Sequence, residues 1–254
     1  MNSRLLTLAL VLFGTLAIAI AQGQAPAPFN PTVSDTEKTN AGDLKITPVQ
    51  HASVMLEFAG KTIQVDPVGD FSRMNKPADL ILITDIHGDH MSAPAIAQLK
   101  KAGTIVIAPA EVQKTITEAK VMNNGQTQTV NVGGTNIQIE AVPAYNLTRG
   151  PAAGQLYHTK GRGNGYILTL GGKRVYMSGD TECVPEIKAL KNIDVAFLPM
   201  NLPFTQTAEE AAACVKTFRP KVVYPYHYRG MELAPLSAGL SAEKGIEVRL
   251  RNWY

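Results

Sequence analysis

The chain has 254 residues, of which 45% are hydrophobic and 18% are charged. It is therefore long and apolar enough to bury a core, and intrinsic disorder and collagen-like repeats are excluded. The formal net charge is only +3, and Lys and Arg do not form a cluster of the kind that follows a phosphate backbone. A small molecule is thus a better expected partner than nucleic acid.

The start of the chain is typical of an export signal. Arg4 supplies a positive charge, Leu5–Ile20 is an uncharged and largely apolar run, and Ala19 and Ala21 are the small residues that a signal peptidase reads. We expect residues 1–21 to be a signal peptide cut after Ala21, and the mature chain to be periplasmic or secreted. An uncleaved membrane anchor is the weaker alternative, because the apolar run is short for a bilayer, so no stable membrane insertion is expected after cleavage.

The following segment and the domain differ in pattern. Residues 22–42 are rich in Ala, Pro, Thr and Asn and lack apolar periodicity, which predicts a flexible leader into one domain over residues 43–254. Short apolar and β-branched runs predict strands over 44–49, 53–58, 62–65, 80–83, 104–107, 128–132, 135–142, 165–170, 173–177 and 195–198, and another beginning at 222. Two-residue turns at 59–60, 133–134 and 171–172 predict hairpins.

Longer apolar patterns between these strands predict helices over 93–101, 110–119, 185–190 and 208–218. Ser92 is the expected N-cap of the first, and Thr207 the expected cap of the last, with Glu210 completing a capping box. Hairpins mixed with strand–helix units predict an α/β chain of mixed sheets covered by helices.

The two cysteines, Cys183 and Cys214, leave two interpretations open. In an oxidising compartment they could form a disulfide. They are equally consistent with two buried small hydrophobic residues.

The strongest chemical motif is Asp85-Ile86-His87-Gly88-Asp89-His90, directly after an apolar strand. In extended backbone, Asp85 and His87 point to the same side, and Gly88 lets the chain turn so that Asp89 and His90 aim at a second position. Acidic and imidazole groups packed this densely would be costly to bury without a cation, so the motif predicts a metal site.

Two later strands end in further ligand-type residues. The run Tyr176-Met177-Ser178-Gly179-Asp180 presents a carboxylate, and the run Tyr224-Pro225-Tyr226-His227 presents an imidazole. Either residue alone is more often structural, as a helix cap or a core histidine. Their occurrence together with the first motif is what favours a common site.

The ordered motifs Asp-x-His-x-Asp-His, Ser-Gly-Asp-Thr and Pro-Tyr-His-Tyr resemble the metallo-β-lactamase superfamily, in its branch of lactonase-like hydrolases and relatives of N-acylphosphatidylethanolamine phospholipases. The opening segment His51-Ala52-Ser53-Val54-Met55-Leu56-Glu57, followed by Asp66-Pro67, is also typical of that branch. The resemblance spans nearly all of residues 44–230. It implies a four-layer αβ/βα sandwich of two mixed β-sheets with outer helices and a metal site at the sheet edge.

The resemblance also implies a ligand set. Residues matching Asp89, His90 and His227 bind the second metal of the family, and the residue matching Asp180 bridges both metals. The first metal normally has three histidines, of which only His87 is kept, because Asp85 occupies the place of the first.

The segment 142–146, where the third histidine of the family usually falls, has no histidine. His158 either replaces that ligand or is a surface or substrate-contacting residue. His51 is expected to orient a ligand or line the pocket rather than bind metal. A carboxylate at position 85 shifts the preference toward harder ions such as manganese or iron. Zinc is nevertheless the expected metal, with manganese or iron as alternatives, and one or two ions are expected.

These residues predict an exported metal-dependent hydrolase, in which a metal-bound hydroxide cleaves an ester, lactone, amide or phosphodiester bond. Asp180 and Asp89 are the expected catalytic carboxylates, with Asp89 as ligand and proton acceptor, and Tyr145 or Tyr226 is a candidate proton donor to the leaving group. A metal-depleted binding protein on the same fold is the main alternative. Redox chemistry at di-iron, known elsewhere in the superfamily, is a third reading, but it normally needs a flavin-bearing partner domain.

The substrate is less clear from the sequence. The loop after Tyr145 carries Arg149, Lys160 and Arg162 without an acidic residue, which favours an anionic substrate. A solvated loop is the commoner explanation for such a composition. Oligomeric state is not indicated.

Overall fold

The computed structural model describes residues 34–69 and 71–254. It contains two seven-stranded sheets. The first sheet, in spatial order, consists of β1 (Asp35–Thr39), β2 (Gly42–Gln50), β3 (Ser53–Phe58), β4 (Lys61–Val65), β5 (Ala78–Leu82), β6 (Lys100–Ala108) and β7 (Lys120–Val121). The second consists of β14 (Glu247–Val248), β13 (Val222–Tyr226), β12 (Val195–Pro199), β11 (Lys173–Met177), β10 (Gly163–Leu170), β9 (Thr135–Ala144) and β8 (Thr127–Val132).

Both sheets follow the same plan of pairing. Strands β1 to β4 are antiparallel and β4 to β7 are parallel, while β8 to β11 are antiparallel and β11 to β14 are parallel. The hairpin turns at 59–60, 133–134 and 171–172 connect paired strands as predicted, because Phe58 pairs with Lys61, Val132 with Thr135, and Leu170 with Lys173. The antiparallel half of each sheet is thus built from local hairpins, and the parallel half from crossovers.

Alternation of side chains along the strands builds three apolar layers. In β5, Leu80 and Leu82 face the other sheet, and Ile81 faces the outer layer. In β12, Phe197 faces the other sheet and Leu198 faces outward. This period of two is what a strand buried on both faces requires.

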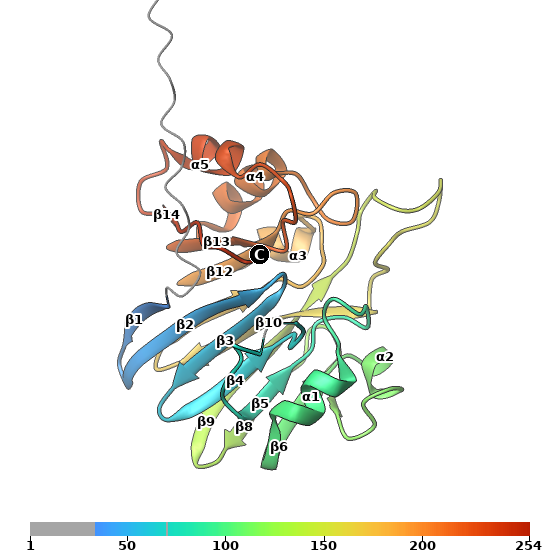
Figure 1. The fold of residues 1–254 in the computed structure, drawn as a ribbon. Coiled ribbons are helices and arrows are strands. Elements are labelled where there is room, and N and C mark those ends of the chain that lie inside the picture. Colours follow the sequence, from blue (N-terminus) through green and yellow to red (C-terminus); the bar gives the residue numbers. More distant parts are fainter. Residues whose placement is uncertain (1–33, 70) are drawn as a thin grey trace, which may run out of the picture.

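Five helices lie outside the sheets, namely α1 (Ala93–Leu99), α2 (Ala110–Gln113), α3 (Pro185–Lys188), α4 (Ala208–Phe218) and α5 (Ala234–Leu240). Helices α1 and α2 cover the first sheet, and α3, α4 and α5 cover the second (Figure 1). The structure therefore confirms the predicted four-layer sandwich of two mixed sheets with outer helices.

The helix starts were predicted better than the helix ends. Ser92 caps α1, and Thr207 with Glu210 forms the expected capping box of α4. The expected helix over 93–101 ends at Leu99, where β6 begins, and the helix over 185–190 ends at Lys188. The helix over 110–119 ends after one turn, because consecutive β-branched residues at 115–117 disfavour its continuation.

The expected leader needs correction at its C-terminal end. Residues Asp35–Thr39 form β1, which pairs along the edge of β2, so part of the segment predicted to be flexible is a strand. The strand has a polar sequence without an apolar stripe, and Asp35 is held by Arg251 and Tyr224 from the far end of the chain. The predicted signal peptide, residues 1–21, lies outside the described residues.

The last residues of the chain return to the start of the domain. Trp253 is completely buried in the layer between the sheets, and its carbonyl accepts a hydrogen bond from the backbone N–H of His51 at 3.0 Å. This contact places Tyr254 beside the turn between β2 and β3.

Candidate metal centre

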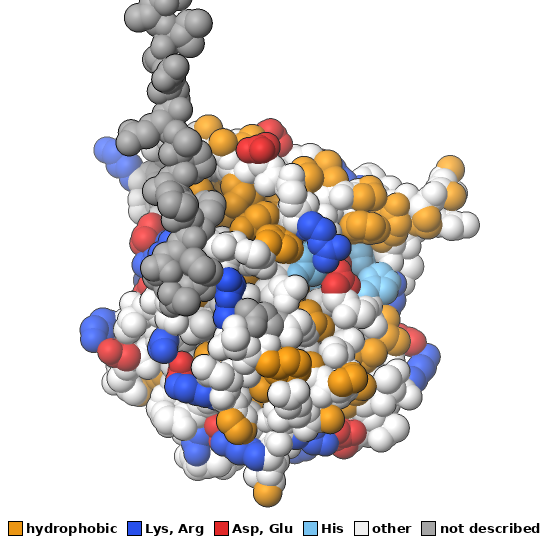
Figure 2. All heavy atoms as spheres, in the orientation of Figure 1, with side chains coloured by type: hydrophobic (Ala, Val, Ile, Leu, Met, Phe, Trp, Pro, Cys, Tyr) orange, Lys and Arg blue, Asp and Glu red, His pale blue; other side chains and the backbone are white. Residues whose placement is uncertain are grey.

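The predicted ligands gather at one edge of the sandwich, because each follows a strand or precedes one there. The motif at 85–90 follows β5, Asp180 follows β11, and His227 follows β13. His158 lies in the loop before β10, and His51 lies in the turn between β2 and β3. Figure 2 shows histidine side chains around an acidic side chain at the surface, with hydrophobic side chains beside them. The carboxyl ends of parallel strands thus meet where α/β folds commonly bind their ligands.

His90, Asp180 and His227 form a buried cluster. His90 Nε2 lies 3.3 Å from Asp180 Oδ2, and His227 Nε2 lies 3.3 Å from Asp180 Oδ1. Asp89 stands at the edge of this cluster, with its Oδ2 3.3 Å from His227 Nε2. Burial alone would raise the pKa of Asp180, but the surrounding His227 and His90 hold it well below its usual range, so the group is a carboxylate.

The orientation of His90 is fixed by a carboxylate behind it. Asp66 Oδ2 lies 2.8 Å from His90 Nδ1 and also accepts a hydrogen bond from the hydroxyl of Thr84 at 2.6 Å. The other oxygen of Asp66 accepts from the backbone N–H of Thr84 at 2.7 Å. Because Nδ1–H is donated to Asp66, Nε2 is the nitrogen of His90 that faces Asp180, and it would offer its lone pair to a bound metal.

His51 holds Asp89 in a similar way. His51 Nε2 lies 3.0 Å from Asp89 Oδ2, and its Nδ1 lies 2.6 Å from the hydroxyl of Tyr254. Burial lowers the pKa of His51, which favours the neutral ring. A carboxylate can only accept, so Nε2–H donates to Asp89 and Tyr254 donates to Nδ1.

Both nitrogens of His51 are therefore engaged, as a ligand-orienting residue requires. The hydroxyl of Tyr254 is itself fixed, because it accepts the backbone N–H of Arg229 at 2.7 Å. Tyr254 was not predicted, since it is 203 residues from His51 in sequence and no local motif marks it.

Asp85, His87 and His158 form a second, outer cluster. His87 Nδ1 lies 3.0 Å from Asp85 Oδ2, and the rings of His87 and His158 meet edge to face at 5.2 Å. The side chain of His87 is 45% exposed, whereas Asp85 is buried. Burial would raise the pKa of Asp85, but the hydrogen bond with His87 and the charges of His90 and Arg162 lower it to about 2.

The loop between β9 and β10 brings His158 to Asp180. His158 Nε2 lies 3.2 Å from Asp180 Oδ2. Asn146 Oδ1 accepts both the backbone N–H of His158 and its ring Nδ1–H at 2.8 Å. Since Nδ1–H is donated to Asn146, Nε2 is the nitrogen that faces Asp180, and it would offer its lone pair to a bound metal. Of the two interpretations left open by the sequence, the geometry favours the ligand.

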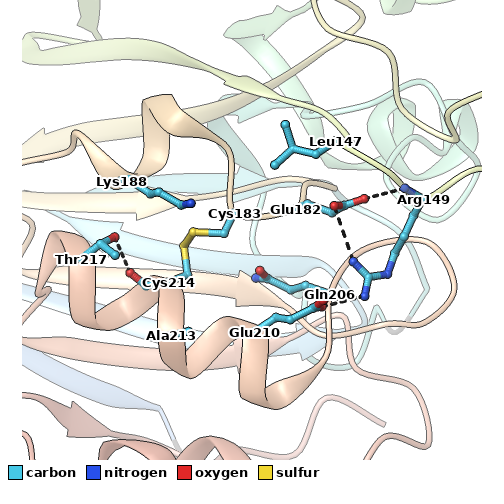
Figure 3. A pocket seen from close by; sticks show the side chains of 10 residues that line it. All are labelled: Leu147, Arg149, Glu182, Cys183, Lys188, Gln206, Glu210, Ala213, Cys214 and Thr217. Atoms are coloured by element: carbon cyan, nitrogen blue, oxygen red, sulfur yellow. Dashed lines mark hydrogen bonds and ion pairs between the residues drawn. A yellow bond between two sulfur atoms is a disulfide. The ribbon is translucent and has the colours of Figure 1, made fainter.

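A disulfide and a buried glutamate fix the segment that follows Asp180. Cys183 and Cys214 form a disulfide, with their Cα atoms 5.7 Å apart. Figure 3 shows this bond at a pocket of about 340 Å³, together with Glu182 and Arg149. Glu182 accepts the backbone N–H of Arg149 at 2.8 Å, and so ties the loop before His158 to the strand end that carries Asp180.

The donor atoms of both clusters fit a divalent metal. His90 Nε2, His158 Nε2, His227 Nε2 and Asp180 Oδ1 are buried and have no hydrogen-bond partner within the described residues. The groups Asp85–His87–His158 and His90–Asp180–His227 each place their ligand atoms within 4.8 Å of one another. Such lone pairs are costly to bury against each other without a cation, and imidazole with carboxylate suits zinc, manganese or iron.

The pocket over these clusters measures about 320 Å³. It is lined by His87, Asp89, Tyr157, His158, Asp180, Phe204 and His227. The aromatic residues Tyr157 and Phe204 were not predicted as site residues. Tyr157 directly precedes His158, but nothing in the sequence indicates that the segment with Phe204 reaches this pocket.

The three cations predicted to contact substrate are each paired with an acidic side chain, and the partner of Arg162 belongs to the outer cluster of the metal centre. Arg149 pairs with Glu210 at 2.7 Å, Lys160 with Glu186 at 2.5 Å, and Arg162 with Asp85 at 2.8 Å. Their pairing removes the basis for expecting an anionic substrate from the composition of the loop. The acidic partners come from distant segments, so the loop alone did not reveal them.

The structure does not place the predicted proton donors at the pocket. The hydroxyl of Tyr145 donates to Glu186 at 3.0 Å, and Tyr145 is not among the residues that line the pocket. The hydroxyl of Tyr226 is buried, where it accepts the backbone N–H of Gly179 at 2.9 Å. Tyr145 is thus anchored at the helical layer, and Tyr226 supports the turn before Asp180.

Comparison with known proteins agrees with this geometry. Residues 45–227 match the model of the beta-lactamase superfamily domain. A UPF0173 metal-dependent hydrolase of Geobacillus sp. (strain WCH70) is 31% identical over 198 residues, covering 73% of this chain and 85% of the relative. The corresponding hydrolase of Thermococcus kodakarensis is 32% identical over 198 residues, covering 73% of this chain and 84% of the relative.

Among solved structures, a candidate metal-dependent hydrolase from Parabacteroides distasonis has a TM-score of 0.79 and 45% identity, covering 87% of this chain and 98% of that one. A metallo hydrolase from Ignicoccus hospitalis shares the fold, with a TM-score of 0.69. It is 24% identical, and the match covers 82% of this chain and 95% of that one. The fold, the matched span and the ligand constellation agree, and the chain belongs to the metallo-β-lactamase superfamily, with UPF0173 metal-dependent hydrolases among its relatives.

Proposed function

We propose that this metal-dependent hydrolase is exported, that it uses zinc in preference to manganese or iron, and that it cleaves an ester, lactone, amide or phosphodiester bond. The observation that carries the proposal is the set of buried, unpartnered nitrogen and oxygen atoms around Asp180. Its relatives are named as metal-dependent hydrolases, which agrees with this chemistry.

Asp89, His90, Asp180 and His227 would hold one ion, and Asp85, His87 and His158 would hold a second beside Asp180. A bound divalent metal polarises the bond to be cleaved and lowers the pKa of water to about 7. Asp180 would support both positions, since its Oδ1 faces His227 and its Oδ2 lies beside both His90 and His158. Asp89 is held by His51 and borders the pocket, so that it can accept a proton from the attacking water.

Export is supported by two features of the chain. Residues 1–21 have the pattern of a signal peptide, and the disulfide between Cys183 and Cys214 is of the kind that persists in oxidising compartments. Within the described residues, no helix is long and apolar enough to span a membrane.

The test is metal content and turnover on the same preparation. The full chain, purified from its export compartment without added metal, is analysed by elemental mass spectrometry and screened against esters, lactones, amides and phosphodiesters. We expect two ions per chain and hydrolysis that a chelator abolishes. Bound metal without turnover of any of the four classes would instead favour a binding protein on this fold.

Asp180→Ala is the informative variant. It should lose turnover and most of the metal while keeping its circular dichroism spectrum, because Asp180 contacts ligands of both clusters. Asp43→Ala removes an exposed carboxylate that pairs with Lys38 and serves as the control. Hydrolysis by Asp180→Ala at the parental rate would show that the bridging role is wrong.

A further inference from the structure

One wall of the pocket over the metal centre is aromatic. Phe204 and Tyr157 line the pocket together with the metal-site residues, and their rings meet edge to face at 5.0 Å. Phe204 is 40% exposed, and Leu202, two residues earlier, is 36% exposed. A large apolar side chain left exposed inside a pocket commonly marks a contact with a ligand.

The exposed ring sits on a fixed backbone. The N–H of Phe204 donates to the carbonyl of Asn201 at 2.9 Å, and the carbonyl of Phe204 accepts from Asn146 Nδ2 at 2.8 Å. Asn146 is the buried residue that also orients His158. Asn146 therefore contacts both the backbone of Phe204 and the imidazole of His158. These contacts fix the position of Phe204 relative to the metal centre.

The second ring is also anchored. The N–H of Tyr157 donates to the carbonyl of Arg149 at 3.1 Å, and the carbonyl of Tyr157 accepts from Arg162 Nη1 at 2.9 Å. Tyr157 is half-buried and directly precedes His158. The backbone that carries both rings is thus held in place, which lowers the cost of ordering this wall when a planar or aliphatic group binds.

The charges around the pocket argue against an anionic group on this wall. Among the described residues that line the pocket, none is Lys or Arg, so no side chain there would pair with an anionic group of the substrate. The neighbouring Arg162 is committed to Asp85 through two hydrogen bonds, of 2.8 and 3.1 Å. A neutral apolar group needs no such partner.

We propose that Tyr157 and Phe204 form a subsite for an uncharged aromatic or short aliphatic group of the substrate, next to the bond that is cleaved. This inference rests on the proposed metal-dependent hydrolysis and adds the substrate class, a neutral ester, lactone or amide with an apolar substituent. Such a group would cover the rings and bury apolar surface on binding.

The test uses three metal-binding probes that share a hydroxamate head, namely acetohydroxamate, benzohydroxamate and para-carboxybenzohydroxamate. Their affinities for the zinc-loaded full chain are measured by isothermal titration calorimetry. We expect benzohydroxamate to bind about tenfold tighter than acetohydroxamate, because the phenyl group buries apolar surface on the rings. The carboxylated probe should bind no tighter than benzohydroxamate.

In Phe204→Ala the preference for the phenyl probe should fall to about twofold or less, while acetohydroxamate keeps its parental affinity. Leu147→Ala is the matched control. Leu147 is 46% exposed on the loop that leads to His158, but it lines the pocket beside the disulfide rather than the pocket over the metal centre. That variant should retain the tenfold preference.

Equal binding of acetohydroxamate and benzohydroxamate, or a preference that survives in Phe204→Ala, would overturn the subsite. Tightest binding of the carboxylated probe would overturn it in favour of an anionic substrate. Failure of all three probes to bind would instead contradict the metal centre itself, and the subsite would fall with it.

Discussion

The two halves of the metal centre are built differently. In the buried cluster, His90 is held by Asp66, and Asp89 at its edge is held by His51. In the outer cluster, His87 is 45% exposed, and the carboxylate of Asp85 is shared with Arg162. A half whose donors are fixed in advance binds metal at lower cost than a half with an exposed donor that must first be ordered.

The outer cluster nevertheless reproduces the charge of the site it resembles. An imidazole ligand is neutral, and Asp85 together with Arg162 also carries no net charge. The carboxylate in place of a histidine therefore does not by itself make this position more acidic. His158, oriented by Asn146, restores the imidazole that the segment 142–146 lacks.

Removing one histidine from each half should give the largest difference in zinc affinity between the two halves. His90→Ala removes a fixed ligand and leaves Asp66 and Asp180 buried without it, so zinc affinity should fall by more than about 100-fold. His87→Ala removes an exposed ligand and should weaken only one of two ions, by about tenfold. Competition with a chromogenic zinc chelator measures both affinities, and circular dichroism checks the fold.

A larger loss in His87→Ala than in His90→Ala would reverse the order of the two halves. Equal losses would indicate that the ions bind as a coupled pair, and the division into two clusters would then have no energetic meaning. The comparison is made at one pH and one salt concentration, because proton release accompanies zinc binding to histidine.

Sequence patterns predicted which residues of the buried half lie at strand ends, whereas their roles as metal ligands came from the family resemblance and stay a prediction. Asp89, His90, Asp180 and His227 each follow an apolar strand, and strand ends are recognisable by the alternation before them. The same alternation predicted most strands of the two sheets. These features are local, so a single sequence carries them.

Features that depend on distant contacts were not predictable. Tyr254 reaches His51 because the C-terminal segment packs back over the sheets, and β1 is a polar strand that is held by Arg251. The aromatic wall requires Phe204 and Tyr157 to meet across two loops. Loops lack the periodicity from which their tertiary contacts could be inferred.

Asn146→Leu tests how much the orientation of His158 contributes to zinc affinity in the outer cluster. Leu has a similar volume but cannot accept the N–H groups of His158, so the ring loses its fixed orientation. Outer contacts of this kind typically contribute 10–100-fold in metal affinity, and we expect the weaker zinc ion to lose about that much while the tighter ion keeps its affinity. Nitrogen chemical shifts of His158 provide a second readout, because they report which ring nitrogen carries the proton.

A control for Asn146→Leu is Asn131→Leu, which removes an exposed side-chain hydrogen bond with Asn136 on the second sheet. It should change neither zinc affinity nor the His158 signals. Unchanged His158 signals in Asn146→Leu would show that Asp180 alone orients the ring.

Asp35 lies outside both clusters, and its substitution tests whether zinc binding depends on the stability of the fold. Burial raises the pKa of Asp35, but hydrogen bonds from Arg251 and Tyr224 outweigh it and hold the pKa below its usual value. The folded state therefore favours the carboxylate. Its stabilising contribution is complete above the ordinary pKa of about 3.9 and is lost as the pH falls through the lowered value in the folded state.

Asp35→Asn should lower the free energy of unfolding at pH 7 by about 1–2 kcal/mol, because the charged hydrogen bonds with Arg251 are lost. Urea unfolding should show this difference shrinking below about pH 4, where the parent chain begins to lose the same interaction. Zinc content should stay at the parental value, because Asp35 contacts Tyr224 and Arg251 rather than either cluster. A loss of zinc in Asp35→Asn at neutral pH would mean that general destabilisation empties the site, and the losses in the histidine variants could then no longer be assigned to their own halves.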